Sequence, residues 1–200
     1  SDTYETSART YNGDMEYANS YNDGGYGLRA LDKSVKITFS GDVSLSGAIS
    51  LGATTSELSD GGHVHMARKF SKAMIEVAEG GSLTLGSSGI SVNNTLTGNA
   101  GYLLINNGTL NINLDSNWDY LGIIAGSGNL VNGGENTLTL SGTNTYTGDT
   151  TISAGTIKLT GSVNAATDLT IASGATLDLQ ATQTFATLDL DGTITRSAGS

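Results

Sequence analysis

The sequence contains no cysteine, no proline and few charged residues. Only 14% of its 200 residues are Asp, Glu, Lys or Arg. The lack of cysteine excludes a disulfide framework, a thiolate metal site and a cysteine nucleophile. A chain of this length would ordinarily hold about ten prolines, and strands that are hydrogen-bonded on both edges have the strongest reason to lack them. The composition therefore favours an all-β fold.

The charge is negative and unevenly distributed. The net charge of −10 argues against nucleic acid as a partner, because a binder must neutralise phosphates with Lys and Arg. Residues 73–200 hold only Lys158 and Arg196 as basic residues, against ten acidic ones, so we expect an acidic, solvated surface there. No apolar run approaches the roughly 20 residues of a membrane helix, and the N-terminus has no apolar signal segment. We therefore expect a soluble, already processed piece of chain.

Alternation of apolar and polar residues is clearest between Asn136 and Leu159. Leu138 and Leu140 alternate with threonines, and the pattern resumes at Ile152. After a corner that ends at Gly155, Ile157 and Leu159 alternate again. This pattern is typical of short strands with one buried face, joined by turns rather than by continuous strand.

A similar unit recurs along the second half of the chain. An apolar residue is followed, after a corner that contains Gly, by an apolar pair. The five copies begin at Val77, Ile105, Val131, Ile152 and Ile171. Units of this size cannot bury an apolar face alone and must stack on one another. We therefore predict an all-β parallel β-helix, with Leu138, Ile157 and Leu177 in one column and Ile171 and Leu179 also in the core.

We expect one domain, in which residues 35–200 form the β-helix and residues 1–34 form an N-terminal cap or first-coil region. The cap region holds five of the eight tyrosines, which could cover an exposed sheet end or serve as stacking platforms for sugars or a partner. Residues 53–72 interrupt the alternation, and we interpret them as a loop excursion.

The segment from Gly142 to Leu159, GTNTYTGDTTISAGTIKL, resembles the passenger-associated β-strand repeat of autotransporters of Gram-negative bacteria. Within it, Gly142, Gly148 and Gly155 match the family's turn positions. The matching core positions are Leu138, Leu140, Ile152, Ile157 and Leu159. The resemblance implies a right-handed β-helix that is exported to the cell surface through a C-terminal β-barrel absent from this chain. Passengers of this family serve adhesion, self-association or surface display, and some carry proteases or esterases.

The excursion supplies the predicted partner-binding residues, because it concentrates basic side chains on an otherwise acidic chain. These residues are His63, His65, Arg68, Lys69 and Lys72. His63 and His65 would share one face of an extended segment, which would suit two metal ligands. Without a positioned carboxylate pattern, we favour no metal and no other cofactor.

Other candidate residues have structural interpretations. Ser40–Ser44 lacks the serine that a GDSGS-type protease motif requires, and the chain has no GxSxG elbow. Asp178, Asp189 and Asp191 alternate with leucines and should point outward, where they favour solubility over glycan hydrolysis or Ca²⁺ binding. Trp118 falls in a predicted insertion, 116–120, and is expected to be a packing anchor.

These features predict a non-enzymatic surface module. Its partner would be a host-surface protein or glycan, or a second copy of the chain. The alternatives are a glycan-active enzyme on the same helix and an inert spacer for a distal domain.

Overall fold

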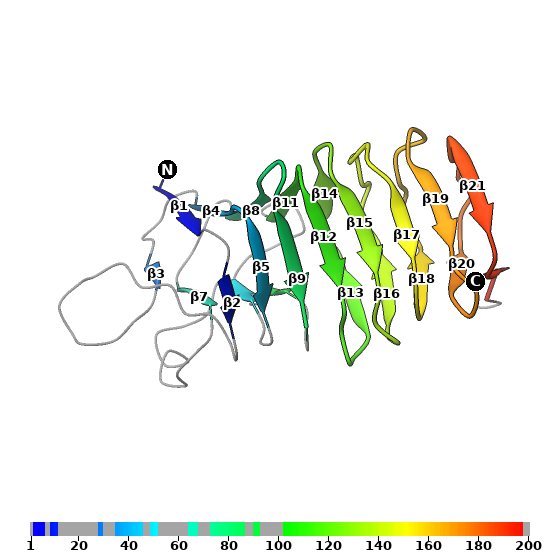
Figure 1. Ribbon diagram of the computed structural model, residues 1–200, viewed down its shortest axis with the longest axis horizontal. Helices are drawn as coiled ribbons and strands as arrows, with labels where there is room; N and C mark the ends of the chain where they lie inside the picture. The colour runs from blue at the N-terminus through cyan, green and yellow to red at the C-terminus, as the bar shows by residue number, and fades with distance from the viewer. Residues whose placement is uncertain are drawn as a thin grey trace.

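The computed structural model describes residues 2–6, 9–11, 28–29, 35–45, 49–51, 64–67, 73–86, 90–92 and 102–197. Within these ranges the regular secondary structure consists of β-strands alone, and each strand pair is parallel. In three of the four sheets the strands stack side by side in chain order along the long axis of the molecule (Figure 1). The predicted all-β parallel β-helix, or β-solenoid, is therefore confirmed.

Three sheets form the walls of the solenoid. The first contains β1 (Asp2–Thr6), β4 (Val35–Phe39), β8 (Ala73–Val77), β11 (Tyr102–Asn106) and β14 (Ile123–Ala125). The second contains β2 (Arg9–Tyr11), β5 (Asp42–Leu45), β9 (Ser82–Leu85), β12 (Thr109–Ile112), β15 (Asn129–Asn132), β17 (Thr150–Ile152), β19 (Asp168–Ile171) and β21 (Thr187–Leu190). The third contains β13 (Trp118–Tyr120), β16 (Thr137–Leu140), β18 (Thr156–Leu159), β20 (Thr176–Leu179) and β22 (Thr193–Thr195).

A smaller fourth sheet is built from the N-terminal half of the chain. It contains β10 (Ile90–Val92), β6 (Ile49–Leu51), β7 (Val64–Ala67) and β3 (Leu28–Arg29), in that order. Strand β7 comes from the predicted excursion and pairs with both β6 and β3. The rest of the 53–72 segment, and most of the predicted cap, lie outside the described residues.

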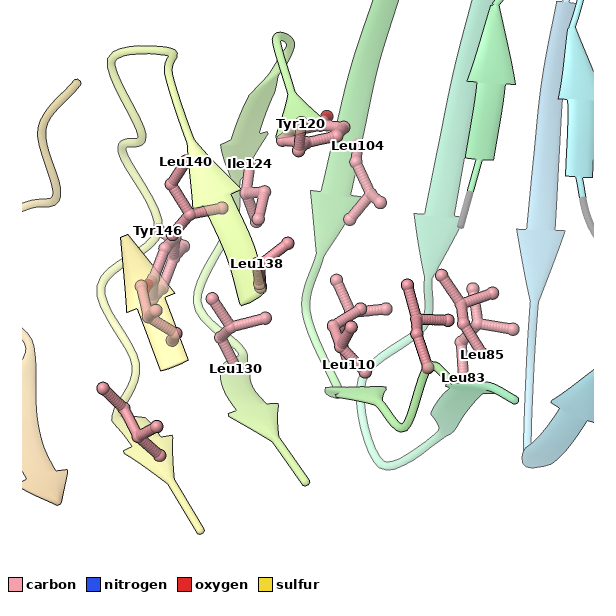
Figure 2. Packing of buried hydrophobic residues seen from close by; sticks show 14 of the residues in the cluster. Leu83, Leu85, Leu104, Leu110, Tyr120, Ile124, Leu130, Leu138, Leu140 and Tyr146 are labelled. Carbon is pink, nitrogen blue, oxygen red and sulfur yellow. The ribbon is translucent and has the colours of Figure 1, made fainter. Parts of the chain in front are cut away.

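The core is a set of columns in which one apolar side chain stacks on the next. The predicted column Leu138, Ile157 and Leu177 is confirmed, since these residues are register partners and each is at most 2% exposed. A second column joins Leu83, Leu110 and Leu130 across neighbouring strands of the second sheet (Figure 2). Each buried leucine contributes about 1.5 to 3 kcal/mol relative to an exposed one, so the stacking supplies the main favourable free energy of folding.

The remaining predicted core residues follow the same pattern, with one exception. Leu140, Ile152, Leu159 and Ile171 are buried. Leu179 is only half-buried, although it packs against the core cluster.

The register corrects two starting points of the predicted repeat. Val77 pairs with Asn106 rather than with Ile105, and Ile152 pairs with Asn132 rather than with Val131. Asn106 and Asn132 are fully buried, whereas Ile105 and Val131 are half-buried on the outer face. The first two predicted copies join the first sheet to the second, whereas the last three join the second sheet to the third. The five predicted copies are therefore not equivalent, because their corners connect different pairs of sheets.

The predicted insertion at residues 116–120 is also corrected. Its last three residues form β13, the first strand of the third sheet, which pairs with Leu138–Leu140. Tyr120 is buried and Trp118 packs against the core, with the two rings in edge contact at 5.2 Å between centroids. Trp118 is therefore a packing residue, but it belongs to a strand and not to a loop.

Candidate functional site

A chain of buried hydroxyl groups crosses the interior at Tyr146. The hydroxyl of Tyr146 lies 2.6 Å from Oγ1 of Thr150, which lies 2.8 Å from Oγ1 of Thr167. Thr167 in turn donates to the carbonyl oxygen of Gly148 at 2.6 Å. All three side chains are at most 4% exposed.

The carbonyl at the end of this chain fixes the direction of every hydrogen bond in it. Because Thr167 uses its only hydrogen on Gly148, Thr150 must donate to Thr167, and Tyr146 must donate to Thr150. Burial raises the pKa of Tyr146 to about 12, an effect that the hydrogen bond to Thr150 partly opposes. The phenol is therefore held neutral, and it fixes the hydroxyl of Thr150, whose hydrogen bond to Thr167 links one coil to the next.

Asparagine side chains reinforce the corners from the inside. Asn144 accepts a hydrogen bond from the backbone N–H of Ile124 at 2.9 Å and donates to the carbonyls of Gly142 and Ser162, both at 3.1 Å. These partners belong to the coil before, the same coil and the coil after. One buried amide thus fixes the spacing of three coils.

The three predicted turn glycines lie where adjacent coils approach too closely for a side chain. A Cβ atom on Gly142 would overlap the carbonyl oxygen of Gly122, and one on Gly148 would overlap that of Gly128. Gly155 is doubly restricted, since its φ is +61° and a Cβ would overlap carbonyl oxygens of the preceding corner. Their role as structural turn positions follows from this contact.

The outer face of the third sheet carries an ordered polar surface. Thr137, Thr156, Thr176 and Thr193 are register partners in one row. In the neighbouring row, Asp178 is 8% exposed, because Ser197 covers it and donates to it from both backbone N–H and hydroxyl, at 2.9 and 2.7 Å. Burial acts to raise the pKa of Asp178, but hydrogen bonds from Ser197 and Gln180 and the charge of Lys158 together lower it.

The predicted outward orientation of the three carboxylates needs one refinement. Asp189 and Asp191 are exposed, whereas Asp178 is hydrogen-bonded within the protein and anchors Ser197, which follows β22. None of the three belongs to a metal-binding group of His, Cys, Asp or Glu among the residues that the structure describes.

Five large apolar side chains are exposed among the described residues. Leu188, Leu190 and Ile194 lie in β21 and β22, and the other two lie at one corner between the third and first sheets. Leu121 is 49% exposed and Ile123 is 38% exposed. They flank Gly122, whose carbonyl oxygen lies against Gly142 of the next coil. The residues that flank Gly142 are Ser141 and Thr143, so this corner is apolar in one coil and polar in the next.

Of the five predicted partner-binding residues, only His65 falls within the part of the chain that the structure describes. His65 lies in β7 opposite Ser50 of β6. His63, Arg68, Lys69 and Lys72 lie outside the described residues, so the binding role of this segment stays a prediction. No described helix is long and apolar enough to cross a membrane.

Sequence reasoning missed the buried polar residues, above all Tyr146, Thr150, Asn132 and Asn144. Alternation places polar residues outside by default, and these residues violate that rule. The signal that could have found Tyr146 is its aromatic ring in a polar stretch, TNTYTGDT, since a lone aromatic residue between two strands usually packs inward.

These observations define a parallel β-solenoid in which buried hydroxyl and amide groups link neighbouring coils. Residues 130–159 match the family model described as passenger-associated-transport-repeat. The match spans β15 to β18 and includes the hydroxyls of Tyr146 and Thr150. Together with the solenoid fold, it fits an autotransporter passenger domain, and that repeat family implies an exported, surface-displayed protein. No curated protein and no solved structure matches the chain.

Proposed function

We propose that this chain is a non-enzymatic passenger module that mediates adhesion to a host-surface protein or glycan, or self-association of bacteria, at the Gram-negative outer membrane. The observation that supports this proposal most directly is the passenger repeat at residues 130–159, set in a regular solenoid. Such a fold presents long, rigid outer walls and uses its interior for stacking.

The use of the buried groups is consistent with a scaffold. Tyr146, Thr150 and Thr167 bond to one another, and Asn144 bonds to backbone groups of three coils. A catalytic group must instead be directed at a substrate. We therefore assign binding to segments that interrupt the repeat, with the 53–72 segment as the first candidate.

The experiment displays the chain on non-adherent cells and measures binding to host cells and cell settling. Changing Arg68, Lys69 and Lys72 to Gln is expected to reduce one of these activities at least tenfold. The matched control changes Lys158 and Arg196 to Gln, which removes basic charge from the repeat region. If both variants bind as the parent does, the assignment to the 53–72 segment is wrong.

A second measurement tests the non-enzymatic part of the proposal. The purified chain is incubated with polysaccharides, and reducing ends are counted. We expect no release above buffer. Release that scales with protein concentration would overturn the proposal in favour of a glycan-active enzyme, and a displayed chain that neither adheres nor aggregates would favour an inert spacer.

A further inference from the structure

The corner between β15 and β16 holds two inward-pointing amides with unpaired polar atoms. Asn132 is 0% exposed and Asn136 is 3% exposed. The side-chain nitrogen of Asn132 donates to the carbonyl of Ala154 at 2.9 Å and approaches that of Gly134 at 3.4 Å, but its Oδ1 has no hydrogen-bond partner. Both polar atoms of the Asn136 side chain are buried without a partner.

The two side chains bracket one short corner. Asn132 is the last residue of β15, Asn136 immediately precedes β16, and residues 133–135 join them. The corner is held against the next coil, because the backbone N–H of Thr156 donates to the carbonyl of Asn136 at 2.9 Å. Both amide side chains are thus buried at the two ends of one corner.

Small residues follow Asn136 in the next two coils. The register places Thr137, Thr156 and Thr176 opposite one another, so the residues before them, Gly155 and Ala175, occupy the positions equivalent to Asn136. Neither residue has a large side chain that could cover the amide from the following coils.

An unpaired buried amide costs about 1 to 3 kcal/mol, and native proteins avoid this cost by pairing such groups or by binding water. We propose that the interior of the β15–β16 corner is a binding site for a structural water molecule held by Asn132 and Asn136. The water accepts a hydrogen bond from Nδ2 of Asn136 and donates one to Oδ1 of Asn132, so it pairs two of the three unpaired atoms.

The chemistry of the donor set selects water over an ion. A cation would be attracted to the two amide oxygens but repelled by the N–H groups of Asn136. Neither amide carries a negative charge that would offset the cost of burying a cation. An anion could use only those N–H groups. Water alone offers both a donor and an acceptor to this pair.

The test uses the full chain with Asn136→Leu, which removes the amide at similar volume. Water magnetic relaxation dispersion counts long-lived internal waters, and we expect one fewer in the variant. The variant should also melt roughly 3 to 6 °C lower, because Asn132 loses its donor. An unchanged count of internal waters, or a higher melting temperature, would overturn the proposal.

Two further measurements keep the test decisive. Asn144→Leu removes an amide that is fully paired within the protein, so it should lower the melting temperature without changing the number of long-lived waters. A crystal structure of the parent chain at high resolution should show ordered density within hydrogen-bonding distance of Asn132 and Asn136. Direct contact between the two amides, with no density between them, would also contradict the site.

Discussion

Removing single hydroxyls from the buried chain at Tyr146 should produce unequal and non-additive losses of stability. Tyr146→Phe removes the first donor, so the only group left without a hydrogen bond is one acceptor site on the hydroxyl of Thr150. Such a loss costs about 1 to 2 kcal/mol. Thr150→Val removes the central group, so the hydroxyl of Tyr146 remains as an unpaired donor and Thr167 also loses a donor.

The central substitution should therefore cost more. Thr150 pairs in register with Leu130 and Leu169, and both leucines are buried in the core. We expect Thr150→Val to lower the free energy of unfolding by about 2 to 3 kcal/mol. In the double variant, Phe and Val pack against each other with no orphan donor. Its loss should fall short of the sum of the single losses by about 1 kcal/mol.

Urea unfolding followed by far-ultraviolet circular dichroism measures the three losses. Valine is β-branched and suits a strand as threonine does, so strand propensity should not obscure the result. The hydrogen-bond order deduced here would be refuted if the losses add to within about 0.3 kcal/mol. A larger loss for Tyr146→Phe than for Thr150→Val would refute it as well.

Three other outcomes follow from the same geometry. The pKa of Tyr146 is raised from 10 to about 12, so the folded state binds more protons than the unfolded state between these pH values. The free energy of unfolding should therefore fall by roughly 2 kcal/mol between pH 10 and 12, and the fall should be smaller in Tyr146→Phe. Gly155→Ala should destabilise the protein by more than Gly174→Ala. Both glycines have positive φ, but only at Gly155 would the added Cβ overlap an adjacent coil. Equal losses of stability in thermal melts would contradict this stacking contact. Ile157→Asp should lower the free energy of unfolding by about 3 kcal/mol or more, whereas Lys158→Gln on the outer face should change the urea midpoint little. Similar losses of stability for the two variants would contradict the assignment of Ile157 to the inner face and Lys158 to the outer face.

The fold could be predicted from the sequence because apolar alternation and glycine corners report directly on stacking. In the third sheet, Leu138, Ile157 and Leu177 fall in the column that their alternation indicates. Their neighbours point outward and are threonines or charged residues, so the pattern has a single interpretation there.

The register of the second sheet could not be predicted in the same way. Asn132 and Thr150 point inward although they are polar, because corner carbonyls and a second hydroxyl satisfy them. A rule based on polarity assigns such residues to the surface and shifts the register by one. The same rule makes Val131 the start of a repeat copy, whereas the register aligns Asn132 with Ile152 and leaves Val131 half-buried on the outer face.

The candidate binding residues show a different limit of sequence reasoning. His63, Arg68, Lys69 and Lys72 were selected for their charge, which indicates a kind of partner but fixes no geometry. The residues whose geometry is known, such as Tyr146 and Asn144, stabilise the solenoid. The functional prediction therefore rests on the family match and on the segments that depart from the repeat.

The central claim is that successive coils stack in register, with one face of each strand inward. The absence of cysteine allows a direct test, because introduced cysteines have no competing thiol. Thr137 and Thr156 are register partners on the outer face of β16 and β18. Adjacent strands lie about 4.8 Å apart, and a disulfide requires Cα atoms about 4.4 to 6.8 Å apart.

The decisive measurement is disulfide formation in the folded protein under mild oxidation, read by mass spectrometry. Thr137→Cys with Thr156→Cys should cross-link, whereas Thr137→Cys with Ile157→Cys should not, since Ile157 points into the core. Cross-linking of the second pair in the absence of the first would contradict the register and the inward face on which the account depends.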